Sequence, residues 1–277
     1  MSSSGFAEKT RQPAVAGQFY PGSADQLQAQ VDGFLKTGET EQGIIGAVLP
    51  HAGYVYSGSV AGETVSRLAV PETVVILGPN HTGLGSAVSV FPEGNWAMPF
   101  GNVPIAQDLA KTIIQKVGLA EADDMAHLRE HSIEVQLPFL HYRRNAPLRF
   151  VPVTLSALST EDCRLIGESL AGIIDKWDDE ILLIASSDMT HYESHQAATR
   201  KDTEAIERIL AMDPEGLIKT VYSRKISMCG IIPTAVLLFA AKAMGATGAR
   251  LVRYTTSGET SGDYDQVVGY AGILVHK

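Results

Sequence analysis

The 277-residue sequence has little cysteine and an excess of acidic over basic side chains. Its two cysteines, Cys163 and Cys229, are too few for the disulfide framework that is typical of small secreted proteins. The chain has 31 acidic side chains against 22 lysines and arginines, which gives a formal charge of −9. Because a nucleic-acid-binding protein needs a basic face to hold phosphates, this balance argues against a nucleic-acid partner.

The sequence also has no long apolar run. The run near the C-terminus, residues 235–241, is far short of the roughly 18 residues that suggest a membrane span. Residues 1–6 have neither the basic region nor the apolar region of a secretory signal. These absences predict a cytoplasmic protein without a membrane partner.

What the sequence does have is an ordinary globular composition. Hydrophobic residues make up 45% and charged residues 19%, which excludes a chain that is disordered for want of apolar side chains. No repeat or long linker interrupts the chain, so we expect a single domain over residues 1–277.

Apolar runs alternate with helix-like segments along most of the chain. Continuous apolar runs predict buried strands at residues 44–49, 73–77, 150–155 and 181–185. Helices are expected at residues 23–35, 59–68, 104–117, 132–142, 160–176 and 233–244. The pattern predicts an α/β fold with a mixed, mostly parallel central sheet and helices on both faces, in which residues 251–255 and 267–275 form an antiparallel edge.

Three of the predicted strands are followed by a histidine among small and polar residues. His51 follows the strand at 44–49, His81 the strand at 73–77, and His191 the strand at 181–185. Because ligands of parallel α/β sheets lie at the carboxyl ends of the strands, we expect these imidazoles at one edge of the sheet. A single loop histidine is more often a solvated side chain, but three at equivalent positions favour a functional site.

Asp188 precedes His191 by three residues, so the two side chains could lie side by side. An aspartate that orients an imidazole makes it a better general base, which gives both residues a candidate catalytic role. The alternative is that Asp188 caps a short helix. His127, His131 and Glu134 have helical spacing within and before the segment 132–142, which alone is weak evidence for a metal site, and a partly solvated helix face explains it better.

Cys229 lies shortly before the predicted helix 233–244, with Pro233 at its first position. A helix N-terminus stabilises a thiolate, so we expect the pKa of Cys229 to be below that of a free cysteine. The alternative is a small buried apolar residue. We accept that alternative for Cys163, which lies inside the predicted helix 160–176.

Five motifs in order resemble those of the Memo family, also called AmmeMemoRadiSam system protein B. They are Pro50-His51-Ala52-Gly53-Tyr54, Gly78-Pro79-Asn80-His81, Glu130-His131-Ser132-Ile133-Glu134, Ser187-Asp188-Met189-Thr190-His191 and Met228-Cys229-Gly230. The family is similar in fold to the LigB-type class III extradiol dioxygenases. The resemblance implies that His51, His81 and Cys229 bind a metal and that Asp188 and His191 line the same pocket. It also makes His131 a candidate residue of that pocket or of its immediate surroundings.

The resemblance also implies a metal-binding redox or dioxygenase-like protein that uses iron or copper, and it links the chain to the other AmmeMemoRadiSam proteins. The dioxygenases have a carboxylate where this chain has Cys229, and a thiolate shifts the metal preference towards Cu(I) or zinc. Two further functions stay open: a non-catalytic module that binds a peptide or a small anionic ligand in the pocket, and a metal-assisted hydrolase.

Overall fold

In residues 9–38 and 40–277, which the computed structural model describes, four parallel strands form the centre of a nine-stranded sheet. They lie side by side in the order β2 (Ile44–Leu49), β9 (Ile181–Ser186), β3 (Thr73–Pro79) and β8 (Arg149–Leu155). All seven residues of β3 are buried, as expected of a central parallel strand that has both faces covered.

Both sides of this parallel centre end in antiparallel pairs. On one side β12 (Val267–His276) runs antiparallel to β2 and also pairs with β10 (His191–Glu193) and β11 (Gly248–Thr256). On the other side β4 (Val88–Val90) runs antiparallel to β8 and carries β7 (Ala120–Ala122). The expected antiparallel edge is therefore confirmed.

A second, three-stranded sheet lies outside the main one. It consists of β1 (Thr10–Arg11), β5 (Asn95–Met98) and β6 (Gly101–Pro104). Because β1 pairs with β5, in parallel, this sheet joins the N-terminal segment to the middle of the chain.

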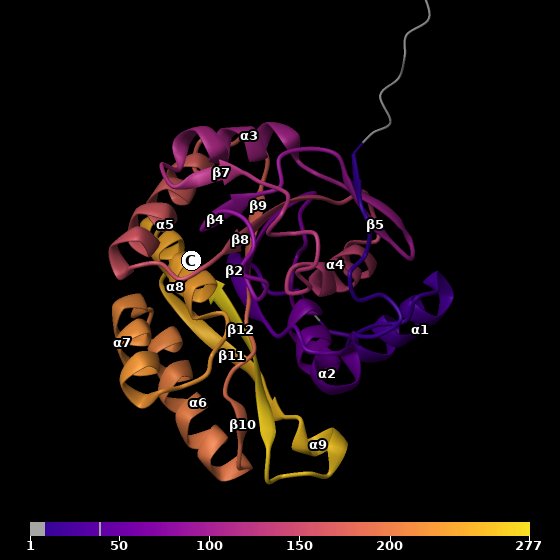
Figure 1. The fold of residues 1–277 in the computed structure, drawn as a ribbon, viewed down its shortest axis with the longest axis vertical. Helices are drawn as coiled ribbons and strands as arrows, with labels where there is room; N and C mark the ends of the chain where they lie inside the picture. Colours follow the sequence, from indigo (N-terminus) through magenta and orange to yellow (C-terminus); the bar gives the residue numbers. More distant parts are fainter. Residues whose placement is uncertain (1–8, 39) are drawn as a thin grey trace, which may run out of the picture.

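Helices cover both faces of the main sheet (Figure 1). On one face lies α8 (Ile231–Ala243), with α5 (Thr160–Ile174) packed on it, and on the other lies α2 (Tyr54–Val65). The remaining helices are α1 (Ala24–Phe34), α3 (Gln107–Lys116), the 3₁₀ helix η1 (Glu134–Gln136), α4 (Leu137–Arg144), α6 (His195–Leu210), α7 (Pro214–Arg224) and α9 (Gly258–Ser261). The predicted fold class is confirmed.

Helix α8 is apolar on all sides because it is buried between the sheet and α5. A Cβ atom at Gly167 of α5 would lie 2.6 Å from the Cβ of Phe239, so only glycine permits this close approach of the two helices. The packing fixes the start of α8, and with it Cys229, beside the strand ends.

Three helix predictions need correction. Helix α2 begins at Tyr54 instead of residue 59, because the buried Tyr54 side chain reaches the core and donates a hydrogen bond to the carbonyl oxygen of Val135 (2.6 Å). Helix α8 begins at Ile231, so Pro233 is its third residue. Residues 132–142 form a turn, η1 and most of α4 instead of one helix.

Among the described residues, no helix has the length and apolar character needed to cross a membrane. The single-domain range 1–277 stays a prediction, since residues 1–8 and 39 lie outside the described part of the chain.

Candidate metal site

Three neighbouring strands end at the same edge of the sheet and deliver His51, Asp188 and His81 there. His51 follows β2, Asp188 follows β9, and His81 follows β3, with β9 between the other two strands. The ring centroids of His51 and His81 are 5.2 Å apart. The structure therefore brings these two histidines together as expected from the parallel strand order.

Cys229 joins them from the start of α8. Its Sγ lies 3.2 Å from Nε2 of His51 and accepts the backbone N–H of Asp188 at 3.3 Å. The next residue, Gly230, must be glycine because a Cβ there would lie 2.3 Å from the carbonyl oxygen of Ser186. Ligand atoms of His51, His81 and Cys229 all lie within 4.8 Å of one another, so the three residues form a group that could hold a metal ion.

The hydrogen bonds of His51 determine which ring nitrogen is free. Nδ1 of His51 is 2.9 Å from Oγ of Ser186, and that hydroxyl donates its only hydrogen to the carbonyl oxygen of Ser132 (2.7 Å). The Ser186 oxygen also accepts a hydrogen bond from Nε2 of Gln136 (2.8 Å). Nδ1 must therefore be the donor to Ser186, which leaves the lone pair on Nε2, next to Cys229.

His51 is also kept neutral. Its side chain is buried, and burial lowers the pKa of the imidazole well below its ordinary value. The neighbouring imidazoles of His131, His81 and His191 lower this pKa further. A neutral imidazole is the form that binds a metal.

Glu130 fixes the ring of His81 in the same way. Nδ1 of His81 lies 2.9 Å from Oε1 of Glu130, and a carboxylate only accepts, so Nε2 of His81 carries the lone pair. Burial alone would lower the pKa of His81, but the hydrogen bond and the charges of Glu130 and Asp188 raise it. Burial would raise the pKa of Glu130, but the hydrogen bond from His81 and further donors lower it to about 2.

Asp188 is buried and contacts the loop that carries His51. Its Oδ1 accepts the backbone N–H of His51 at 2.8 Å. Burial raises the pKa of Asp188 to about 6, although the N–H of His51 and the charge of His191 act in the opposite direction. The alternative role as a helix cap is wrong, because β10 follows Asp188 instead of a helix.

His191 lies close to this group but outside it. Its Nδ1 is 3.0 Å from the carbonyl oxygen of Ser227, so this nitrogen carries the proton and Nε2 the lone pair. Among the described residues no hydrogen bond joins His191 to Asp188, so the expected direct pairing is not found. The two residues interact through their charges alone.

His131 lies beside both histidines, where the family resemblance, but not its helical spacing, suggests a pocket residue. Its ring stacks on that of His81 at 4.9 Å between centroids and meets that of His51 edge-on at 5.5 Å. The helical spacing to His127 and Glu134 is misleading, because His127 is buried against the carbonyl oxygen of Ser89 (3.2 Å) and Glu134 faces the N-terminal segment. The signal that could have been followed is the adjacent pair Glu130-His131.

The expected low pKa of Cys229 is also wrong for the metal-free thiol. Burial and the neighbouring carboxylate of Asp188 raise this pKa well above its ordinary value, although the backbone N–H groups of Asp188, Cys229 and Gly230 act against them. Cys163 is fully buried among apolar residues, as expected, and burial raises its pKa to about 11.

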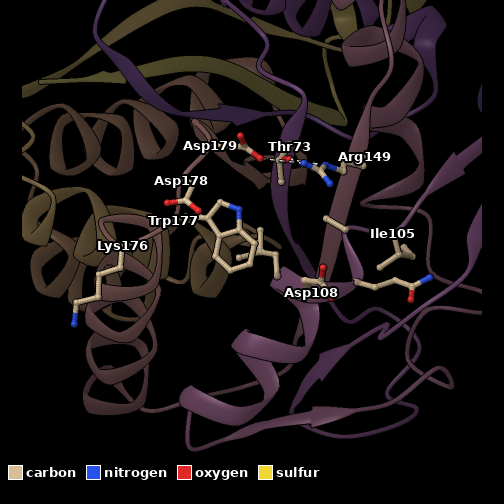
Figure 2. A pocket seen from close by; sticks show the side chains of 11 residues that line it. Thr73, Ile105, Asp108, Arg149, Lys176, Trp177, Asp178 and Asp179 are labelled. Atoms are coloured by element: carbon tan, nitrogen blue, oxygen red, sulfur yellow. Dashed lines mark hydrogen bonds and ion pairs between the residues drawn. The ribbon is translucent and has the colours of Figure 1, made fainter.

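A separate cavity of about 590 Å³ lies at the opposite end of the parallel strands (Figure 2). Its lining includes Thr73 at the start of β3 and Arg149 at the start of β8. Arg149 is already paired with Asp179 (3.0 Å) and Glu72 (3.2 Å). This cavity shares no residue with the histidine and cysteine group.

Comparison with known proteins identifies the family. The model of the Memo-like protein family matches residues 11–274. The chain belongs to the Memo-like protein family. A MEMO1 family protein of Methanopyrus kandleri is 46% identical over 280 residues, which cover 96% of this chain and 99% of that protein. A MEMO1 family protein of Methanosarcina barkeri is 44% identical, with coverage of 96% and 99%.

A solved structure supports the fold. The crystal structure of an uncharacterized protein from Escherichia coli K12 superposes with a TM-score of 0.54 and covers 83% of this Memo-like chain and 99% of its own. Its sequence is 12% identical, so this likeness concerns the fold alone.

Proposed function

We propose that this Memo-like protein binds a redox-active metal, iron or copper, through His51, His81 and Cys229 and acts as an oxidoreductase. One observation carries the proposal: Sγ of Cys229 lies 3.2 Å from Nε2 of His51, the ring nitrogen that carries the lone pair. Neighbours hold the other nitrogens of both imidazoles, as the partners of metal-binding histidines generally do.

The donor set favours these metals for chemical reasons. Two imidazoles suit iron, copper and zinc, and a thiolate adds preference for soft ions such as Cu(I). Three protein ligands also leave room for a further ligand, which is typical of catalytic metal sites. When bound, iron or copper would supply electron transfer or oxygen chemistry that the side chains cannot supply themselves.

Asp188 and His191 are proposed to handle protons at this site. Since the pKa of Asp188 is about 6, its carboxyl group can take up or release a proton near neutral pH. His191 keeps a lone pair on Nε2 because its Nδ1 donates to Ser227. Both residues lie beside the metal ligands, where a general acid or base would be needed.

A binding function without catalysis is the second candidate. Exposed apolar side chains follow the site residues in the sequence: Val55 and Tyr56, after His51, are 62% and 43% exposed, and Tyr192, after His191, is 74% exposed. Such residues could hold a peptide or another small ligand over the imidazoles. A cytoplasmic location and a link to the other AmmeMemoRadiSam proteins belong to the same proposal and rest on the sequence.

Metal analysis of the untagged full chain tests the proposal. Stoichiometric iron or copper after anaerobic reconstitution is the expected result, and the Cys229→Ser variant should lose copper binding. Stoichiometric zinc alone would favour the hydrolase, with Asp188 or His191 activating water. No uptake of Fe(II) or Cu(I) would favour the binding function.

A further inference from the structure

A second set of metal-binding side chains overlaps the first. Ligand atoms of His81, Glu130 and His131 also lie within 4.8 Å of one another. The carboxylate oxygen Oε1 of Glu130 stands 2.9 Å from Nδ1 of His81 and 3.4 Å from Nδ1 of His131. Two imidazole nitrogens and one carboxylate oxygen thus lie close together at Glu130.

These separations fit a metal ion. Nitrogen and oxygen ligands lie about 2.1 Å from a divalent transition metal, so two ligands at right angles are about 3.0 Å apart. The two separations from Glu130 are close to that value. The rings of His81 and His131 stack with 19° between their planes, so one of them has to turn for both Nδ1 lone pairs to reach the same ion.

The carboxylate of Glu130 is held in place before any metal arrives. It is 1% exposed, and its oxygens accept the backbone N–H groups of His81 (2.6 Å), His131 (2.9 Å) and Ser132 (2.9 Å). Glu130 is therefore a buried carboxylate that backbone N–H groups hold in place, unlike a flexible acidic side chain on the surface.

The position of the His131 ring is not fixed by any hydrogen bond of its ring nitrogens within the described residues. In the described part of the chain its only polar ring contact is with Glu130, at 3.4 Å, and its other ring neighbours include Phe19 at 4.8 Å between centroids. Its side chain is 22% exposed, so an ion from solvent can reach it.

We propose that His81, Glu130 and His131 form a second metal position, which takes a harder divalent cation of the Fe(II) or Mn(II) type. Two imidazoles and a carboxylate with open positions suit such ions better than they suit Cu(I), whereas Cys229 makes the first position soft. The inference rests on the proposed function only through His81, which both positions share.

Because they share His81, the two positions are filled one at a time. A neutral imidazole has one ring proton. The first position needs that proton on Nδ1 and the lone pair on Nε2, whereas the second needs the lone pair on Nδ1 and the proton on Nε2. Movement of one proton between the two ring nitrogens therefore exchanges one position for the other, without net proton uptake or release by His81.

Parallel anaerobic titrations of the metal-free full chain with Mn(II), followed by electron paramagnetic resonance, and with Cu(I), followed by competition with a chromophoric chelator, test this. We expect Cys229→Ser to keep Mn(II) affinity within about threefold and to lose Cu(I). Glu130→Gln and His131→Asn should lower Mn(II) affinity at least tenfold, a minimum suggested by losses of about 10–100-fold for supporting residues alone. His131→Asn should change Cu(I) binding little, and His81→Ala should lose both metals.

Preloading with one equivalent of Cu(I) should block Mn(II) uptake. His141→Ala, a histidine that stacks on Phe100 away from both sets, is the matched control and should bind both metals normally. Because Glu130→Gln could fold poorly, its circular dichroism is compared with that of the unchanged protein. If Glu130→Gln is misfolded, the result for His131→Asn decides the test.

The outcomes separate the two proposals. Loss of Mn(II) binding in Cys229→Ser would mean that hard ions use the first position and that Glu130 only orients His81, which overturns the second position. Normal Cu(I) binding without any Mn(II) binding also overturns it and leaves the proposed function intact. Mn(II) binding that depends on Glu130 and His131, without Cu(I) or Fe(II) binding that depends on Cys229, would support the second position and contradict the first.

Discussion

Glu130 and Glu134 lie four residues apart, and both are buried, yet their surroundings differ in kind. Glu134 accepts hydrogen bonds from Nη1 of Arg11 (2.5 Å), the hydroxyl of Tyr20 (2.6 Å) and the backbone N–H of Ala14 (2.7 Å). Glu130 instead faces imidazoles, whose other nitrogens are free to bind a ligand.

The difference separates a structural cluster from a functional one. Around Glu134 the polar groups are paired with one another, and the Arg11 guanidinium also lies 4.0 Å from the ring centroid of Trp96. Such a fully paired network fastens the N-terminal segment to the core. In the group of His51, His81 and Cys229, the Cys229 thiol can donate one hydrogen bond to Nε2 of His51 (3.2 Å), and the ligand atoms of all three residues lie close enough together to hold an ion.

The largest expected effect breaks the structural cluster. Glu134→Gln leaves the buried Arg11 guanidinium without its counter-ion, so we expect a loss of about 3–5 kcal/mol in the free energy of unfolding. Urea denaturation of the metal-free protein measures it, and Glu161→Gln, in an exposed pair with Arg164, should change nothing measurable. Unchanged stability in Glu134→Gln would show that the network does not hold the N-terminal segment.

The second prediction concerns the functional cluster. His81→Ala should weaken Cu(I) binding at least about 100-fold, or about 2.7 kcal/mol. It should cost the metal-free protein little stability, because the His81 side chain is 36% exposed. Chelator competition and urea denaturation of the same variant measure the two effects. A large stability loss with unchanged Cu(I) affinity would show that His81 has a structural role and does not bind the metal.

His51 sharpens this contrast, because it is only 2% exposed. Its replacement by alanine leaves a void and removes the partner of the Ser186 hydroxyl. We therefore expect the metal-free His51→Ala protein to be less stable than the unchanged protein, unlike a variant at an exposed loop histidine.

The third prediction follows from the pKa values of two carboxyl groups. The pKa of Asp188 is raised to about 6, so its contribution to stability is present below about pH 4 and is lost as pH rises through 6. That of Glu130 is lowered to about 2, so its contribution is present above about pH 4.5 and is lost as pH falls through 2.

Asp188→Asn should therefore gain stability relative to the unchanged protein between pH 4 and pH 7, by about 1–2 kcal/mol. Glu130→Gln should become less stable relative to the unchanged protein as the pH rises from 2 to 4.5, because only the unchanged protein gains the contribution of the ionised Glu130. Denaturant titrations at closely spaced pH values measure both, and a difference independent of pH in either variant would contradict its assigned shift.

Much of the first metal position could be predicted because it depends on chain order. Buried apolar runs fix the strands, and parallel strands must bring His51 and His81 to one edge. The supporting residues were not predictable in this way. Ser186 is the last residue of a buried strand, and Gln136 belongs to a short 3₁₀ helix, so neither carries a local pattern that marks it.

The helical spacing of His127, His131 and Glu134 is misleading for a related reason. Arg11 donates hydrogen bonds to the carbonyl oxygens of His127 (2.8 Å) and Glu130 (2.6 Å), and these contacts hold the segment as turns. A partner more than 100 residues away in the sequence thus decides the local structure, which periodicity cannot reveal.

The smallest expected effect compares the two cysteines. Burial raises the pKa of both thiols, so in the metal-free protein each should react with an alkylating reagent more slowly than a free cysteine at neutral pH. Cys229 is partly exposed whereas Cys163 is buried, so we expect Cys229 to react about fivefold faster. A bound metal should abolish this difference by protecting Cys229 alone. Mass-spectrometric mapping of alkylation with and without Cu(I) measures both rates, with Cys163 as the internal control. Equal rates and no protection would remove Cys229 from the ligand set and leave His51 and His81 without their thiolate.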